Sequence, residues 1–240
     1  MGLLDLLSRK YSLQESGILS DSVDRHSHIL HGVDDGIKQI EDSLEVLRFE
    51  ESMGVKEVWC TPHVMEDVPN TTESLKDRFD ELCAAYSGPV KLRLAAEYML
   101  DTLLESRLET DDLLTMEDDL LLVETSTVAA PYGLKSILGD ILSKGYRPLL
   151  AHPERYRYLE LKDYETIFSM GVRFQLNIGS LTGYYGSSAK SRAEWLLSND
   201  LYSVYGSDCH RLKAICNQYR TKILTKDIIT RLTKLNICQD

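Results

Sequence analysis

The sequence predicts an α/β fold in which helices cover a parallel sheet, and two observations lead to this prediction. Seven short apolar segments with the length of strands alternate with segments of helical periodicity along the 240 residues. No glycine-rich phosphate-binding fingerprint follows the first predicted strand, which argues against an open dinucleotide-binding sheet. Seven parallel strands are close to the count of a closed barrel, and chains of this length commonly fold as one α/β barrel.

The predicted strands are short apolar runs, and each finishes near a titratable residue. The second run ends just beyond a proline, and the fourth is apolar enough to be buried on both faces. We predict strands over residues 22–30, 55–63, 90–99, 119–126, 147–155, 173–181 and 201–210.

Apolar spacing and end signals predict the helices between these strands. Apolar residues recur at helical spacing in residues 40–54, and Gly54 follows as a stop signal. Thr71 or Thr72 stands before acidic residues as a capping signal, and Gly88 is expected to end that helix. We predict helices over residues 40–54, 71–88, 132–145, 163–171, 187–200 and about 225–236, with a further acidic, leucine-rich helical segment between 99 and 119.

We divide the chain into an N-terminal extension, residues 1–22, and a single barrel domain, residues 23–240. No internal repeat or low-complexity linker interrupts the second part. Four leucines near the start predict a short amphipathic helix: Leu3, Leu4, Leu6 and Leu7. A surface arm packed on its own domain is favoured over a membrane or partner anchor, because so short a helix has little apolar area to bury.

Composition disfavours several classes of protein. The net charge is −11 and no strongly basic block interrupts this acidity, so a nucleic acid partner is not expected. No run of about 18 apolar residues exists, which predicts that the chain has no membrane span. The five cysteines form an odd count without a CxxC pair. This count argues against a disulfide framework and predicts a reducing compartment, the cytoplasm.

Titratable residues collect at the ends of the predicted strands. The set comprises His26, His28, His63, Glu97, Glu124, His152, Asp208 and His210, with Asp35 in the loop after the first strand. The carboxyl ends of all strands meet at one rim of an α/β barrel, so these residues are expected to converge. Residues two apart on a strand point to the same face, which pairs His26 with His28 and Asp208 with His210.

The same nine residues predict a site for more than one metal ion. Carboxylates crowded at one rim repel one another and titrate abnormally unless cations are present. A transition metal ion takes about four to six ligands, so the set predicts two to three divalent ions. Mixed imidazole and carboxylate ligands without thiolate suit manganese, iron or zinc, and the ligand types do not choose among these metals.

The ordered motifs HSH, DDG, TPH, AEY, VET, AHPER and SDCH resemble those of the PHP (polymerase and histidinol phosphatase) superfamily. Within it, HSHILHGVDDG, the downstream EDSLE and AHPERYR resemble the bacterial capsule-biosynthesis protein-tyrosine phosphatases. The resemblance runs from about residue 24 to residue 211. It implies a distorted seven-stranded (β/α) barrel with the active site at the C-terminal rim and a metal centre often described with manganese. It also implies dephosphorylation of a membrane-associated bacterial tyrosine kinase that controls capsular or exopolysaccharide synthesis.

By motif position, the resemblance makes all nine rim residues metal ligands: His26, His28, Asp35, His63, Glu97, Glu124, His152, Asp208 and His210. The catalytic residues would be Arg155, Asp208 and His210. The resemblance implies that Arg155 contacts the substrate phosphate, and a guanidinium fork does match phosphate geometry.

Two positions depart from the pattern of these phosphatases. Relatives usually carry a second phosphate-binding arginine a few residues after the last histidine, where this chain has Ile215. Arg211 is our candidate for this substrate-binding role, and Lys213 and Arg220 are alternatives. At His31 relatives often have proline, and both a solvent-facing loop residue and a rim proton donor remain open.

The remaining alternatives concern the chemistry. No cysteine is followed six residues later by an arginine, and no GxSxG elbow is present, so neither a cysteine nor a serine nucleophile is supported. Metal-assisted hydrolysis of phosphotyrosine therefore stands first, with phenolate (pKa about 10) as a fair leaving group. A small-molecule phosphatase such as histidinol phosphatase is the alternative. A DNA exonuclease module and a metal-stabilised binding module are less favoured. Tyr156 and Tyr184 or Tyr185 are candidates to stack on a substrate ring.

Overall fold

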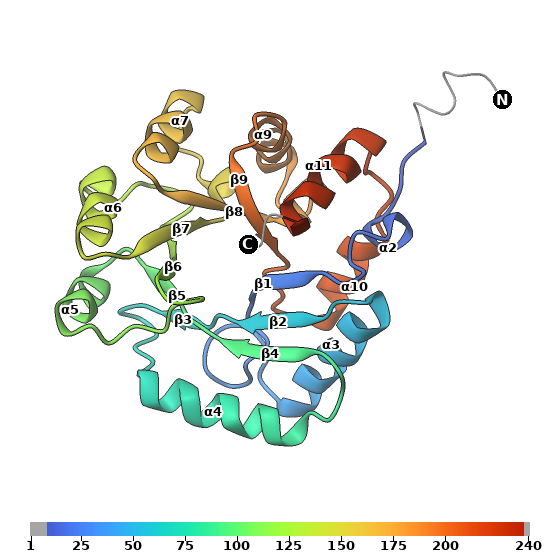
Figure 1. Ribbon diagram of the computed structural model, residues 1–240, viewed down its shortest axis with the longest axis horizontal. Coiled ribbons are helices and arrows are strands. Elements are labelled where there is room, and N and C mark those ends of the chain that lie inside the picture. Colours follow the sequence, from blue (N-terminus) through green and yellow to red (C-terminus); the bar gives the residue numbers. More distant parts are fainter. Residues whose placement is uncertain (1–8, 238–240) are drawn as a thin grey trace.

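Parallel strands surround the middle of the molecule and helices lie outside them in the computed structural model, which describes residues 9–237 (Figure 1). The strands are β1 Val23–Ser27, β2 Glu57–Cys60, β3 His63–Val64, β4 Lys91–Leu94, β5 Glu97–Met99, β6 Leu120–Glu124, β7 Arg147–Ala151, β8 Arg173–Asn177 and β9 Tyr202–Gly206. The helices are α2 Leu13–Ser16, α3 Ile40–Met53, α4 Thr72–Ala85, α5 Thr102–Thr110, α6 Leu134–Ser143, α7 Leu161–Ser169, α8 Ile178–Leu181, α9 Ser187–Ser198, α10 Leu212–Arg220 and α11 Lys226–Ile237, with a 3-10 turn η1 at Pro153–Arg155. The predicted α/β class with parallel strands is confirmed.

The strands form two sheets, and the expected seven-stranded barrel does not close. The sheet orders are β1-β2-β4 and β3-β5-β6-β7-β8-β9, and all their pairings are parallel. Two of the seven predicted strand segments are interrupted, which yields nine strands in the described chain. One break falls at Pro62, which has no N–H for a ladder. The other falls at Ala96, whose N–H bonds to the Leu114 carbonyl instead of a neighbouring strand.

The two sheets meet where β1 ends. Asp208 N donates to the His26 carbonyl at 2.7 Å, and His28 N donates to the Cys209 carbonyl at 3.0 Å. A single parallel bridge between Ser27 and Cys209 accompanies these bonds. The tip of β1 therefore lies beside the segment that follows β9, although about 180 residues separate them in the chain.

Most predicted helices are present, with differences at their ends. Gly54 caps α3 with a φ of 87°, and Thr71 caps α4 by accepting the Ser74 N–H. The prediction that Gly88 ends this helix is wrong, because Tyr86 is the C-cap. The predicted strand 173–181 ends at Asn177 and continues as the short helix α8. Helix α10 was not predicted, although its buried residues Ile215, Gln218 and Tyr219 recur at helical spacing.

The described part of the N-terminal extension packs on the body of the protein. Leu13, Ile18 and Leu19 are buried in the main core, and Tyr11 forms an antiparallel bridge with Leu224. The predicted leucine-rich helix at the start lies outside the described residues. Division of the chain at residue 22 therefore stays a prediction. Within residues 9–237, no helix is long and apolar enough to cross a membrane.

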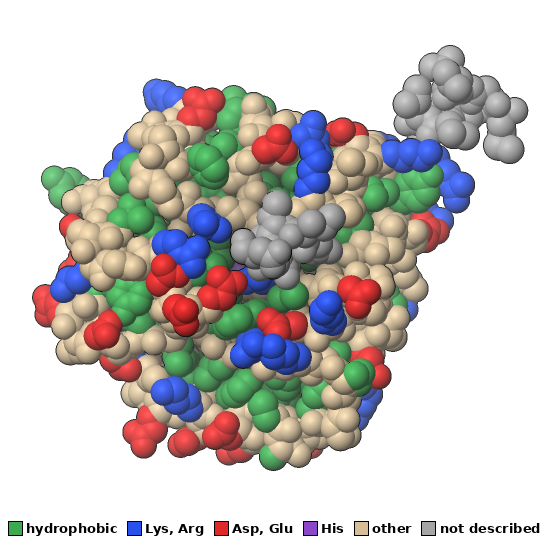
Figure 2. All heavy atoms as spheres, viewed as in Figure 1, with side chains coloured by type: hydrophobic (Ala, Val, Ile, Leu, Met, Phe, Trp, Pro, Cys, Tyr) green, Lys and Arg blue, Asp and Glu red, His purple; other side chains and the backbone are tan. Residues whose placement is uncertain are grey.

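Charged side chains of both signs are interspersed over the face in Figure 2. Ion pairs link Arg25 to Glu117 at 2.8 Å and Lys91 to Glu57 at 3.0 Å, so the charges largely compensate one another. Such a mixed surface gives no broad positive field for a nucleic acid backbone on this face, in agreement with the net charge.

Candidate metal centre

The structure brings all nine predicted ligand residues to one mouth of the fold. His26 belongs to β1 and His28 follows it, whereas His63 and Glu97 begin β3 and β5. Glu124 ends β6, His152 follows β7, and Asp208 and His210 follow β9. Asp35 lies in the loop after β1. The carboxyl ends of parallel strands gather at one edge, which explains why residues so far apart in the chain converge.

Glu97 lies at the centre of the inner part of this cluster. Its Oε2 lies 3.2 Å from Nε2 of both His26 and His28, and its Oε1 lies 3.1 Å from His152 Nε2. Asp208 Oδ1 is 3.3 Å from His28 Nε2. Glu97 and these three histidines are buried.

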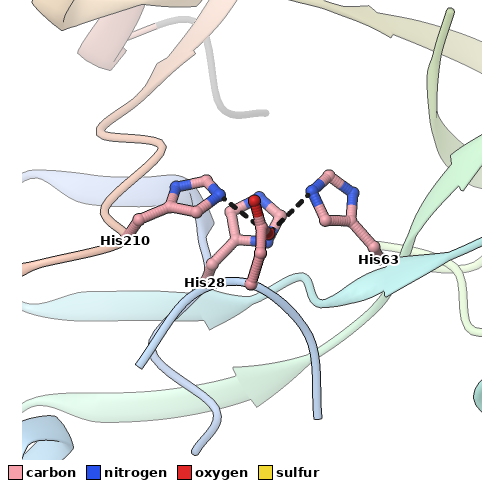
Figure 3. Close-up of side chains that lie close together, drawn as sticks. His28, His63 and His210 are labelled. Atoms are coloured by element: carbon pink, nitrogen blue, oxygen red, sulfur yellow. Dashed lines mark ion pairs between the residues drawn. The ribbon is translucent and has the colours of Figure 1, made fainter. Parts of the chain in front are cut away.

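Asp35 closes the outer part of the cluster. Figure 3 shows His28, His63 and His210 converging around a carboxylate. Asp35 Oδ1 is 3.4 Å from His63 Nε2 and 3.3 Å from His210 Nε2, and its side chain is exposed. The other nitrogen of His63 faces inward, 3.0 Å from Glu124 Oε1.

The donor set fits divalent cations. Both carboxylate oxygens of Glu97 are buried and receive no hydrogen bond, although imidazole nitrogens lie near them. A buried carboxylate without hydrogen bonds is costly unless cations compensate it. Ligand atoms gather in four overlapping groups: His28, Asp35, His63 and His210; His26, His28 and Asp208; His26, Glu97 and His152; and His63, Glu97 and Glu124. These nitrogen and oxygen donors suit manganese, iron or zinc.

Hydrogen bonds fix which nitrogen faces the centre in three of the five histidines of the cluster, His26, His28 and His210. His26 Nδ1 lies 2.9 Å from Gln175 Oε1, and His28 Nδ1 lies 2.8 Å from Asp34 Oδ2. His210 Nδ1 lies 2.9 Å from the Asp208 carbonyl. Because all three partners are acceptors, Nδ1 carries the proton and Nε2 is free to bind a cation. Such outer partners are a regular feature of metal sites.

Neighbouring charges shift the pKa values of His63 and Glu97 in opposite directions. Burial lowers the pKa of His63, but hydrogen bonds with Asp35, Glu124 and Glu97 outweigh burial and raise it. Burial raises the pKa of Glu97, but the positive charge of His26 and the adjacent imidazoles of His152 and His28 hold it well below the usual range. The raised pKa of His63 favours a protonated imidazole beside these carboxylates, and a bound cation would displace that proton.

Arg155 lies at the edge of the cluster, where its guanidinium group forms an ion pair with Asp208. Its Nη1 donates to Asp208 Oδ2 at 2.9 Å, and its Cζ lies 4.4 Å from the centre of the Tyr185 ring. Asn177 Nδ2 and the Tyr185 hydroxyl donate to the same oxygen at 2.7 and 3.1 Å. Asp208 therefore turns one oxygen to the histidines and the other to Arg155.

A cavity of about 310 Å³ opens onto these residues. Its walls include Arg155, Tyr184 and Tyr185 as well as Ile215. Tyr184 and Tyr185 are thus placed to contact a substrate ring. The prediction for Tyr156 is wrong, because Tyr156 is fully buried and donates to the Ala151 carbonyl at 2.8 Å.

Two other candidate residues, Arg211 and His31, do not line this cavity. Arg211 is exposed as the N-cap of α10 and is not among the residues that line the cavity, so its role stays a prediction. Ile215 occupies the wall where relatives usually carry arginine. His31 lies 3.4 Å from Arg78 and 3.5 Å from Glu81, away from the nine ligands, which favours a structural role over a proton donor.

Cysteine chemistry finds no support in the structure. Cys60 and Cys209 are buried, and burial raises the pKa of both thiols. A thiol held in its neutral form is a poor nucleophile.

Sequence reasoning missed two polar residues on β8. Gln175 orients His26 and also accepts the His152 N–H at 3.2 Å, while Asn177 holds Asp208. Both are buried and lie two apart near the end of a strand that is otherwise mostly apolar. That spacing is the signal that could have identified them, because residues two apart on a strand share a face.

The comparison with known proteins agrees with this geometry. Residues 22–234 match the family model described as capsular polysaccharide synthesis, CpsB/CapC. The chain belongs to the CpsB/CapC family. The predicted resemblance to the capsule-biosynthesis phosphatases of the PHP superfamily is therefore confirmed.

Named relatives of this CpsB/CapC chain are tyrosine phosphatases. The tyrosine-protein phosphatase YwqE of Bacillus subtilis is 28% identical over 200 residues, which cover 80% of this chain and 78% of YwqE. The tyrosine-protein phosphatase CpsB of Streptococcus pneumoniae is 30% identical over 210 residues, covering 79% and 83%. A solved structure from the work on YwqE and CpsB, described as metal-dependent tyrosine phosphatases, superposes with a TM-score of 0.76 at 26% identity, covering 88% of this chain and 86% of that one.

Proposed function

We propose that this protein is a metal-dependent phosphatase that hydrolyses phosphotyrosine in a protein substrate. The observation that carries the proposal is the clustering of nine imidazole and carboxylate side chains, six of which line one cavity together with Arg155. Family membership and the names of the relatives support the same activity. The cavity supplies a cation site beside a guanidinium, which is the combination that hydrolysis of a phosphate ester needs.

The proposed ligands are His26, His28, Asp35, His63, Glu97, Glu124, His152, Asp208 and His210, and we propose that they hold two to three divalent ions. Manganese is our first choice, with iron and zinc as alternatives. When bound, such ions lower the pKa of water toward neutrality and stabilise negative charge on phosphate oxygens.

The protein's own side chains bind and orient the substrate. Arg155 binds the phosphoryl oxygens through its guanidinium, and Asp208 together with the Tyr185 ring holds that guanidinium in place. Tyr184 and Tyr185 border the space for the substrate ring. His210 lies at the outer edge of the cluster, where Nε2 is held beside Asp35. Phenolate leaves without a strong general acid because its pKa is near 10.

We further propose a cytoplasmic location and a membrane-associated tyrosine kinase of capsular or exopolysaccharide synthesis as the substrate. The family description and the phosphatase names of the relatives support this assignment. The division into residues 1–22 and 23–240, and substrate binding by Arg211, are carried forward as proposals as well.

The decisive experiment joins elemental analysis of the purified protein to a phosphotyrosine-peptide assay. We expect activity to disappear after treatment with chelator and to return when Mn²⁺, Fe²⁺ or Zn²⁺ is restored, and Asp208→Ala to abolish turnover. Asp67→Ala, at an exposed position with no side-chain contact in the described structure, serves as the matched control. Activity that survives complete metal removal would overturn the mechanism. Faster turnover of histidinol phosphate than of the peptide would overturn the substrate class.

A further inference from the structure

A second cavity adjoins the catalytic one. It has a volume of about 560 Å³, and Arg155 and Tyr185 belong to the walls of both cavities. Its other walls come from the loop after β6, from η1 and the residues after it, and from α9, and they include Glu154, Arg157, Ser188 and Arg192. None of the nine candidate metal ligands lines it, so it is separate from the metal centre.

Three arginines line this second cavity, and two of them have no acidic partner. Arg157 is exposed, and no hydrogen bond or ion pair engages its side chain in the described structure. Arg192 donates to the backbone carbonyls of Tyr156 and Arg157, at 2.5 and 3.1 Å, and to no carboxylate. Both guanidinium groups are therefore left without a carboxylate partner in a chain whose net charge is −11.

Glu154, the one acidic residue in the walls, does not neutralise them. Its Oε1 accepts from the Ser180 hydroxyl at 2.7 Å and from Asn177 N at 3.1 Å, and its Oε2 accepts from the Tyr202 hydroxyl at 2.8 Å. The carboxyl group is buried and committed to these three donors. The cavity therefore keeps a positive potential.

We propose that this cavity, through Arg157 and Arg192, binds a second anionic group of the substrate, carried by a residue near the phosphotyrosine in the same peptide. The chemistry that fits is a carboxylate or a phosphate, because both match a guanidinium fork. The inference rests on the proposed phosphatase function and adds a sequence preference to it.

Because Arg155 and Tyr185 line both cavities, the two anionic residues of a bound peptide must lie close to each other along its chain. An extended chain advances about 3.3 Å per residue, so one to three residues span about 3–10 Å. A peptide whose phosphotyrosine contacts Arg155 can thus place a neighbouring anion beyond that arginine, in the second cavity. The first turn of α9 borders the same space, and its partial positive charge adds to that of the arginines.

The test measures kcat/KM for a series of phosphotyrosine peptides. One peptide has neutral neighbours, others carry one glutamate at each of the three positions on either side, and a further set carries a second phosphotyrosine there. p-Nitrophenyl phosphate, which has no neighbours, reports the basal activity. We expect the best anionic peptide to exceed the neutral peptide by about 5- to 30-fold at low salt, as expected for a charge-assisted contact.

Arg157→Ala is the informative variant, because the Arg157 side chain holds no other part of the protein. It should reduce the preference for anionic peptides to less than about 3-fold while p-nitrophenyl phosphate turnover stays at the wild-type rate. Arg157→Glu should reverse the preference. Arg48→Ala, an exposed arginine on α3 that lines neither cavity, is the matched control and should keep the full preference.

The outcomes separate this inference from the proposed function. A wild-type protein that cleaves the peptides and p-nitrophenyl phosphate without any preference for anionic neighbours overturns the inference alone. A preference that Arg157→Ala leaves intact does the same. Absence of turnover on every phosphotyrosine substrate overturns the phosphatase function itself. A stronger effect of phosphate than of glutamate would identify a doubly phosphorylated segment as the preferred ligand, and the converse an acidic one.

Discussion

Replacing Asp34 by asparagine tests whether the metal centre depends on its outer hydrogen bonds. Asp34 is buried. Within the candidate ligand set, it forms hydrogen bonds only with the His28 side chain and the His63 backbone N–H. Its Oδ2 accepts from His28 Nδ1 at 2.8 Å and from His63 N at 3.0 Å, and its Oδ1 accepts from Gly36 N at 2.9 Å. Asparagine has the same shape but only one acceptor oxygen and no charge.

The expected loss follows from these three bonds. If the asparagine oxygen keeps the two bonds of Oδ2, its NH₂ group faces the Gly36 N–H, and a buried donor left unsatisfied costs about 1–3 kcal/mol. The bond to His28 also changes from charge-assisted to neutral, a loss of about 1 kcal/mol that makes its Nε2 a weaker ligand. Since 1.4 kcal/mol corresponds to a factor of ten, we expect metal affinity to fall about 10- to 100-fold.

The assay is calorimetric titration of Mn²⁺ into metal-free protein, together with phosphatase activity against free metal concentration. Asp34→Asn should shift both curves to higher metal while far-UV circular dichroism stays that of the wild type. Asp67→Asn, an exposed aspartate, is the matched control and should shift neither. Wild-type metal affinity in a folded Asp34→Asn protein would refute the idea that Asp34 orients the ligands.

Two further predictions concern stability. Burial and the neighbouring Asp24 raise the pKa of Glu50 well above its ordinary value. The folded protein therefore holds a proton that the unfolded chain releases, and the free energy of unfolding falls as the pH rises from the ordinary pKa toward the raised one. The fall is about 1.4 kcal/mol for each pH unit. Glu50→Gln, which still accepts the Tyr219 hydroxyl, should therefore gain in urea-unfolding free energy relative to wild type between pH 5 and pH 8; a difference independent of pH would contradict this. A Cβ at Gly206 would lie 2.4 Å from His26 Cβ and 2.7 Å from its N. Gly206→Ala should thus lower both the unfolding free energy, by about 1–3 kcal/mol, and metal affinity, whereas Gly139→Ala, at an open helical position, should lower neither.

The sequence was sufficient to predict which titratable residues converge, because two regularities act together. Titratable side chains stand out in apolar strands, and the carboxyl ends of parallel strands meet. His26 and Asp208 could therefore be expected to converge without knowledge of the sheet order. The closed barrel could not be predicted in the same way, because closure depends on whether the ladder continues across positions such as Pro62 and Ala96. There the backbone donor is missing or is used elsewhere.

The outer contacts were harder to foresee for a different reason. Gln175 and Asn177 are ordinary polar residues by type, and only the fold places one beside His26 and the other beside Asp208. Tyr156 failed as a rim residue because the turn η1 directs it into the core, where its hydroxyl bonds to the Ala151 carbonyl. Such directions depend on local backbone geometry, which composition and periodicity do not carry.

That backbone geometry is unusual at two candidate ligands. His152 and Asp208 have φ values of 35° and 52°, in the left-handed region that non-glycine residues adopt at a cost of about 1–3 kcal/mol each. His152 directly follows β7 and Asp208 lies two residues after β9, and a left-handed turn redirects the chain at each position. His152 Nε2 then reaches Glu97, and Asp208 reaches both the histidines and Arg155. Glycine would adopt these turns without strain but would offer no ligand. Each left-handed turn thus keeps a side chain that glycine would not provide, and through it His152 contacts Glu97 and Asp208 contacts Arg155.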